Sequence, residues 1–190
     1  AVFGGDTGTV TLGSDVTVGG MTFNTNNYSV VPDGSGITFG APGDINVSTG
    51  TTTISAPISG SAITNTGNGT VELEGVNSFS GLTIEAGAVR ANTGSATFGA
   101  VDSTITINGG QIHGRDTQVH QQSIVLNQAK TSFIKGNSGT WEFTGAVSGT
   151  GGLAVNDAGS VFQRTLKFSS TDNTFTGEID QTTNKSAFYR

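Results

Sequence analysis

The segment Ile105-Thr106-Ile107, followed by Asn108-Gly109, contains the pattern that decides the fold of this chain. In a strand, two apolar side chains that flank a threonine would lie on one face and the threonine on the other. Segments of this kind recur from end to end, each bounded by Gly, Asn or Asp. Further examples are Val10-Thr11-Leu12, Val16-Thr17-Val18, Ile37-Thr38-Phe39, Val71-Glu72-Leu73, Leu82-Thr83-Ile84, Ile124-Val125-Leu126 and Trp141-Glu142-Phe143. Such short strands suit an architecture in which each strand is one rung of a ladder.

The composition supports a β-rich chain and excludes several classes of protein. Gly, Thr, Ser and Asn account for 93 of the 190 residues, and only 12% of the residues are charged. Disordered chains usually have high net charge and few β-branched residues, whereas the apolar residues of this chain are mostly Val, Ile and Phe. No apolar stretch approaches the length of about 18 residues that a membrane-spanning helix requires. The chain contains no cysteine, which excludes disulfides and thiolate chemistry.

Charge is distributed unevenly along the chain, whose formal net charge is −6. Residues 1–89 contain seven acidic residues and no Lys or Arg, whereas residues 90–190 contain eight basic and seven acidic residues. The two parts therefore carry −7 and +1. A nucleic-acid surface would need clustered Lys and Arg, so we expect no nucleic-acid partner. The acidic part is interpreted either as a solvated face or as one end of an assembly whose ends attract each other.

Two internal periods indicate a solenoid. Residues about 58–91 and about 147–181 are similar, and the second copy has a seven-residue insertion that we place around residues 158–164. A shorter period of 21 residues relates Ile63, Ile84, Ile105, Leu126, Val147 and Phe168. Coils of about 20–25 residues lie at the short end of the solenoid range. The sequence therefore predicts one β-solenoid segment over residues 1–190, with about eight or nine coils.

Residues 67–89 resemble the autotransporter-associated β-strand repeat. The resemblance rests on Asn77-Ser78-Phe79-Ser80-Gly81 and on the following Leu82-Thr83-Ile84, and a second copy contains Asn173-Thr174-Phe175-Thr176-Gly177. Ser78 replaces the usual Thr, Phe79 replaces the usual Tyr, and one residue is missing after Gly81. The second copy lacks the closing Gly-Thr-Leu of the family pattern.

The resemblance implies a right-handed parallel β-helix in the passenger of an autotransporter, located outside the cell or on the surface of a Gram-negative bacterium. In that family a C-terminal β-barrel, absent from this chain, provides the only membrane contact. We expect the two asparagines to form turns, in which Asn can bond its own backbone and tolerate left-handed geometry, and the two phenylalanines to pack inward. The predicted structural residues are Asn77, Phe79, Gly81, Gly87, Asn173, Phe175 and Gly177.

The best candidate for a binding patch is the stretch with His113, Arg115, Asp116 and His120. Two histidines seven residues apart could hold a metal only with a third donor from a neighbouring coil. The alternative, which we favour, is that both histidines are exposed polar residues on a turn-rich stretch. We therefore predict no metal site and no cofactor.

Carboxylates provide the one enzymatic alternative. Polysaccharide-cleaving β-helix enzymes place two or three acidic residues on one outer face, and Glu72, Glu74 and Glu85 could lie in this way. Such a cleft also needs aromatic and basic residues, and residues 1–89 contain no Lys or Arg. The only tryptophan, Trp141, shares a face with Phe143 and is expected in the core. No catalytic residue is assigned.

Two functions remain open. The first is a structural or adhesive rod without catalytic activity, which binds a protein or glycan on host or bacterial surfaces. The second is a released effector fragment that engages a specific host receptor, which a non-repetitive cluster over residues 109–135 would favour. A polysaccharide-active enzyme is a third, weaker alternative. Exposed strand edges and unequal charge also predict end-to-end self-association.

Overall fold

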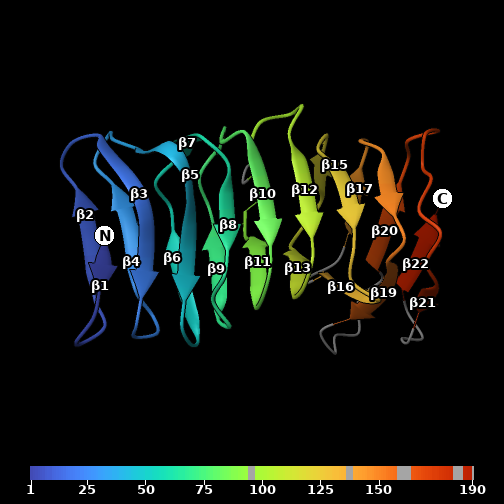
Figure 1. Cartoon of the computed structure of the whole chain (residues 1–190), viewed down its shortest axis with the longest axis horizontal. Coiled ribbons are helices and arrows are strands. Elements are labelled where there is room, and N and C mark those ends of the chain that lie inside the picture. The colour runs from blue at the N-terminus through green and yellow to red at the C-terminus, as the bar shows by residue number, and fades with distance from the viewer. Residues whose placement is uncertain (94–96, 136–138, 158–163, 182–185, 190) are drawn as a thin grey trace.

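The computed structural model describes residues 1–93, 97–135, 139–157, 164–181 and 186–189. These residues form 22 β-strands and no helix, which confirms the all-β prediction. The strands stack as parallel rungs along one axis, from the N-terminus at one end of the rod to the C-terminus at the other (Figure 1). Within the described residues, no helix could cross a membrane.

The strands form three parallel sheets. Sheet A contains β1 (Val2–Phe3), β3 (Val16–Phe23), β5 (Ile37–Val47), β8 (Ile63–Asn65), β10 (Gly81–Ile84), β12 (Thr104–Ile107), β15 (Ser123–Leu126) and β18 (Val147–Gly149), with β7 (Ile58–Gly60) paired to β5. Sheet B contains β2 (Thr9–Leu12), β4 (Ser29–Pro32), β6 (Thr51–Ile54), β9 (Thr70–Leu73), β11 (Ala88–Ala91), β13 (Gln111–Gly114), β16 (Lys130–Lys135), β19 (Gly152–Asp157) and β21 (Ile179–Gln181). Sheet C contains β14 (Gln118–His120), β17 (Gly139–Phe143), β20 (Arg164–Phe168) and β22 (Ser186–Tyr189).

Alternation along each strand places one column of apolar side chains inside the solenoid. In β12, Ile105 and Ile107 are fully buried and Thr106 faces outward. Ile105 lies between Leu82 of β10 and Ile124 of β15, and all three belong to the core. Backbone hydrogen bonds from rung to rung satisfy the short strands, which could not be stable alone. The expected β-solenoid is therefore the observed fold.

The 21-residue period is correct as an average but not as a register. The partners in sheet A are Ile63, Leu82, Ile105, Ile124 and Val147, which are separated by 19, 23, 19 and 23 residues. Turns of unequal length shift the register by two residues and back, and a shift of two keeps the same side chains inward. Phe168 does not continue this column, because it lies in β20 of sheet C.

A change in coil architecture occurs towards the C-terminal half, where sheet C begins. The inward side chains there are largely aromatic: Phe98, Phe133, Trp141, Phe143 and Phe168 are all fully buried. Trp141 and Phe143 pack in a T-shaped pair with ring centroids 4.9 Å apart, and Phe133 and Phe168 form a similar pair at 5.5 Å. Large rings thus fill the core of these coils.

The inward and outward assignments can be tested on one strand. Ile105→Asp places an unpaired carboxylate in the core and should lower the free energy of unfolding by on the order of 4 kcal/mol. Thr106→Asp, on the outward face of the same strand, should change it by less than about 0.5 kcal/mol. Chemical denaturation of the two variants measures both values. Equal losses in the two variants would contradict the assignment.

Candidate binding surface

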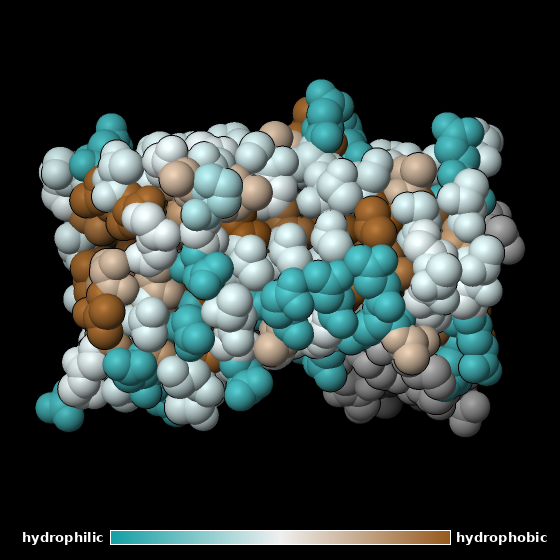
Figure 2. Space-filling view, in the orientation of Figure 1, coloured by the Kyte–Doolittle hydropathy of each residue, from teal (hydrophilic) through white to brown (hydrophobic). Residues whose placement is uncertain are grey.

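The outward face of sheet A consists mainly of neutral polar side chains that bond from coil to coil. Directly after β10, β12 and β15 lie Glu85, Asn108 and Asn127, all exposed. The Asn108 Nδ2 donates to Glu85 Oε1 at 2.7 Å, and the Asn127 Nδ2 donates to Asn108 Oδ1 at 2.8 Å. Figure 2 shows hydrophilic side chains gathered across the middle of the molecule. This row offers amide and carboxylate groups to a partner along the rod.

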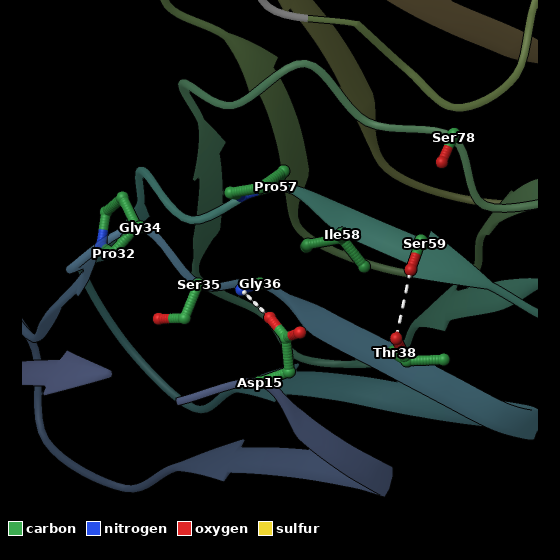
Figure 3. A pocket seen from close by; sticks show the side chains of 10 residues that line it. All are labelled: Asp15, Pro32, Gly34, Ser35, Gly36, Thr38, Pro57, Ile58, Ser59 and Ser78. Atoms are coloured by element: carbon green, nitrogen blue, oxygen red, sulfur yellow. Dashed lines mark hydrogen bonds between the residues drawn. The ribbon is translucent and has the colours of Figure 1, made fainter. Parts of the chain in front are cut away.

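A shallow pocket of about 510 Å³ lies at the corner that precedes sheet A in the first coils (Figure 3). Its polar groups include the Asp15 carboxylate, whose Oδ1 accepts a hydrogen bond from the Gly36 backbone N–H at 2.8 Å. The hydroxyls of Thr38 and Ser59 lie 3.0 Å apart on its floor. Pro32, Gly34, Ser35, Pro57, Ile58 and Ser78 complete the lining. The pocket is rich in hydroxyls and contains no basic side chain.

This pocket was not predicted from the sequence, although the 21-residue period could have identified it. Asp15, Gly36, Pro57 and Ser78 are each 21 residues apart, and all four line the pocket. The backbone bonds from the Val16 N–H to Gly36 O and from the Ile37 N–H to Pro57 O place these residues on successive coils. The period therefore holds strictly at this corner, unlike in the column of sheet A that runs from Ile63 to Val147.

The three carboxylates considered for catalysis are each bonded to a neighbouring coil. Glu72, only 9% exposed, forms an ion pair with Arg90 in which Oε2 and Nη1 are 2.7 Å apart. Glu74 accepts hydrogen bonds from the Ser55 hydroxyl at 2.6 Å and from the Asn92 Nδ2 at 2.9 Å. Together with Glu85, bonded to Asn108, these carboxylates link adjacent rungs. These hydrogen bonds and the ion pair attach each coil to the next.

His113 and its neighbours lie on the outward side of sheet B. His113 follows Glu72 and Arg90 in one column of sheet B, and its Nε2 lies 2.9 Å from Gln111 Oε1. Burial, and secondarily the Arg90 charge, lower the pKa of His113 to about 4. Arg115 and Asp116 are exposed at the corner after β13, where Asp116 has a positive φ of 56°. Neutral His113 thus sits in a hydrogen-bonded polar column.

His120 has a different environment from the exposed turn position that we favoured. It is 3% exposed and faces inward from β14, with its ring centroid 4.7 Å from that of Phe98 and 5.2 Å from that of Phe143. Burial lowers its pKa to about 4. The sequence did not reveal this position because Gln118 and His120 are polar residues at inward positions. The structure therefore does not bring His113 and His120 together in one patch.

Asn77 closes a coil by bonding across it. Its Oδ1 accepts a hydrogen bond from the Ile58 N–H at 2.9 Å, and its Nδ2 donates to the carbonyls of Gly75 at 2.9 Å and Thr97 at 2.8 Å. The side chain is 3% exposed. Unlike Asn27 and Asp116, Asn77 does not have the positive φ expected of a left-handed turn. Its role is to join three coils, because Ile58 lies one coil before it and Thr97 one coil after.

Asn173 makes the same closing bond in the second copy. Its Oδ1 accepts from the Val147 N–H at 2.8 Å, and its Nδ2 donates to Ser170 O at 2.7 Å. The backbone bonds also match, since Thr174 N–H bonds to Val147 O just as Ser78 N–H bonds to Ile58 O. Each motif asparagine thus binds the first strand of its own repeat. The predicted insertion at 158–164 falls almost wholly outside the described residues.

The remaining motif residues support this closure. Phe79 is fully buried and Phe175 nearly so. A side chain at Gly87, where φ is +59°, would overlap with the carbonyl oxygens of Gly67 and Gly69. One at Gly177 would overlap with the backbone of Gly151, whereas Gly81 has room for a Cβ. Gly87 and Gly177 therefore mark close approaches between coils.

No set of three or more His, Asp or Glu side chains in the described part of the chain is arranged to hold a metal ion. The surface is instead suited to many weak polar contacts, since its amides, hydroxyls and carboxylates are ordered by their neighbours on adjacent coils.

The fold and a sequence comparison together fit a repeat region of an autotransporter passenger. Over its whole length the chain is 33% identical, across 191 aligned residues, to the "Adhesin BmaC autotransporter" of Brucella suis biovar 1 (strain 1330). The chain spans 5% of the length of that protein. No protein-family model matches the chain, and no solved structure matches it.

The Asn77 closure gives a direct prediction of stability. Asn77→Ala removes the acceptor of the buried Ile58 N–H and the amide that donates to the Gly75 and Thr97 carbonyls, and should lower the free energy of unfolding by about 2–4 kcal/mol. Ser78→Ala, at the exposed next position, should change it by less than about 0.5 kcal/mol. Urea denaturation of both variants provides the comparison. An Asn77→Ala variant with the wild-type free energy of unfolding would show that the closing hydrogen bonds do not stabilise the fold.

Buried His120 predicts that the coils around β14 lose stability in acid. The unfolded chain binds a proton near pH 6.5, whereas the folded chain holds His120 neutral down to about pH 4. The free energy of unfolding is therefore highest above pH 6.5. It falls by on the order of 3 kcal/mol as the pH is lowered to 4, because the unfolded chain takes up a proton on His120 and the folded chain does not.

Replacing His120 with Phe should flatten the pH dependence of the free energy of unfolding between pH 7 and pH 4. His113→Gln, on the outward face, removes the other histidine whose pKa is lowered to about 4, so each single variant should remove part of the pH dependence. A His120→Phe variant with the wild-type pH profile would contradict the prediction.

Proposed function

We propose that the chain is an adhesive, non-catalytic segment of an autotransporter passenger at the surface of a Gram-negative bacterium. The whole-length similarity to an autotransporter adhesin carries this proposal. The stacked coils of the β-solenoid support it, because a passenger-like rod presents side chains at regular intervals. Its partner would be a protein or glycan on a host or bacterial surface.

The chemistry of the surface favours binding over catalysis. Glu72, Glu74 and Glu85 each accept a hydrogen bond from a neighbouring coil, so their oxygens already have partners. The pocket near Asp15 presents hydroxyls and apolar proline edges without a basic group. These groups suit contact with neutral polar ligands, to which a row of hydroxyls can donate and from which it can accept hydrogen bonds.

The released-effector alternative has less support. The stretch 109–135, which would have favoured it as a non-repetitive loop cluster, forms the regular rungs β13, β14, β15 and β16. Its apolar inward residues, such as Ile112, Ile124 and Leu126, pack in the core, and Gln118, His120 and Gln122 are buried beside them.

Adhesion can be measured with beads that carry the chain on their surface. Beads coated with the wild-type chain should be retained on epithelial cell monolayers or on bacterial lawns, and Thr106→Asp should retain this property. Ile105→Asp, which disrupts the fold, should lose it. Retention no greater than that of uncoated beads on both surfaces would refute the proposal.

A second measurement addresses catalysis. Incubation of the chain with a panel of polysaccharides should release no new reducing ends. Release that depends on Glu72 or Glu74 would replace the adhesive proposal with the enzymatic one.

A further inference from the structure

The shallow pocket near Asp15 is a groove along the rod, because residues of four successive coils line it (Figure 3). Asp15, Gly36, Pro57 and Ser78 follow one another at the same corner. Nine of the ten lining residues lie in the second to fourth coils, each of which is stacked between two others. The groove is therefore formed by the side of the rod.

The second to fourth coils supply the groove with a row of hydroxyls. The Thr38 and Ser59 hydroxyls lie 3.0 Å apart on paired strands, and Ser78 is exposed one coil further. The Ser35 hydroxyl donates to Leu12 O at 2.5 Å, so its oxygen can still accept a hydrogen bond. Because a hydroxyl both donates and accepts, this row can bond to the hydroxyls of a ligand in either sense.

Hydrogen bonds between coils hold the groove in place. Ile58, fully buried at the groove, donates its N–H to Asn77 Oδ1 at 2.9 Å and accepts from the Ser78 N–H at 2.8 Å. The Asp15 carboxylate is held by the Gly36 N–H at 2.8 Å. A ligand therefore meets groups that are already ordered, which lowers the entropic cost of binding.

Charge and shape disfavour other classes of ligand. Residues 1–89 contain no Lys or Arg, and the Asp15 carboxylate repels anions. Among the ten lining residues there is no aromatic or arginine side chain, and such side chains dominate the binding energy of protein interfaces. A peptide cannot add here as a further strand, because β5 is already paired with β3 and β7. These features favour a neutral ligand that carries many hydroxyls.

We propose that this groove binds a neutral oligosaccharide, with successive sugar rings along successive coils. Adjacent coils are about 4.8 Å apart, which is close to the length of one pyranose ring in an extended chain. Ring hydroxyls bond to the row of hydroxyls and to the Asp15 carboxylate, and the C–H faces of the rings pack on the exposed Pro32 and Pro57. The inference names the partner for the proposed adhesive function and rests on it.

Binding can be measured with an array of neutral oligosaccharides and their sialylated or sulfated forms. Neutral members should retain the labelled chain at least as well as the anionic forms do, because the groove has a carboxylate and no basic group. No retention by any neutral member, or tighter retention by the anionic forms, would overturn the proposal.

Two double variants test the position of the site. Thr38→Val with Ser78→Ala removes two hydroxyls from the groove and should weaken retention by about tenfold. Thr64→Val with Ser80→Ala removes the same two groups from outward positions beyond the groove and should leave retention within about twofold. Urea denaturation checks that both double variants fold. Equal effects on retention would overturn the assignment.

The bead assay separates this site from adhesion itself. Wild-type beads that adhere to cells while the array retains nothing neutral would overturn the sugar site and leave the adhesive proposal standing. Retention on the array without bead adhesion would have the opposite meaning. If Thr38→Val with Ser78→Ala abolishes adhesion to cells whose glycans have been removed enzymatically, the groove binds a protein and the proposal is wrong.

Discussion

Parallel backbone hydrogen bonding between successive coils is the constraint on which this molecule depends. A rung of three or four residues has no stability of its own, so every strand requires a partner before and after it. This requirement explains the composition. Inward positions must be apolar and stackable, corners must turn sharply, and outward positions need only tolerate solvent, which Thr, Ser and Asn do.

Side chains reinforce the same contacts. The amide of Asn77 joins three coils. On the outward side of sheet B, Glu72 pairs with Arg90 and Glu74 with Asn92, in each case across adjacent rungs. Such bonds run parallel to the backbone ladder and contribute most where water is excluded, as at Asn77. The carboxylates that were candidates for catalysis thus hold adjacent coils in register. The scaffold that they stabilise orders the binding surface.

The sequence predicted the fold class because alternation and turn residues are local signals. Ile105 and Thr106 were placed on the correct faces, and Trp141 was placed in the core. Register was less predictable, since unequal turns displace Ile84 relative to Ile63 while the average period is preserved. His120 was misplaced because a polar residue gives no pattern that distinguishes an inward from an outward position. The corner pocket escaped notice because it forms only when four coils align.

The two asparagine motifs close coils that both start in sheet A but continue through different sheets. In the first copy the closed coil runs from β7 through β8 in sheet A to β9 in sheet B. In the second it runs from β18 in sheet A through β19 in sheet B to β20 in sheet C. In both copies the motif asparagine therefore bonds to a sheet A strand one turn earlier, whichever sheets the rest of the coil passes through. Since only this closing bond is common to the two coils, a repeat unit can pass through two sheets or through three and still close at the same wall of the rod.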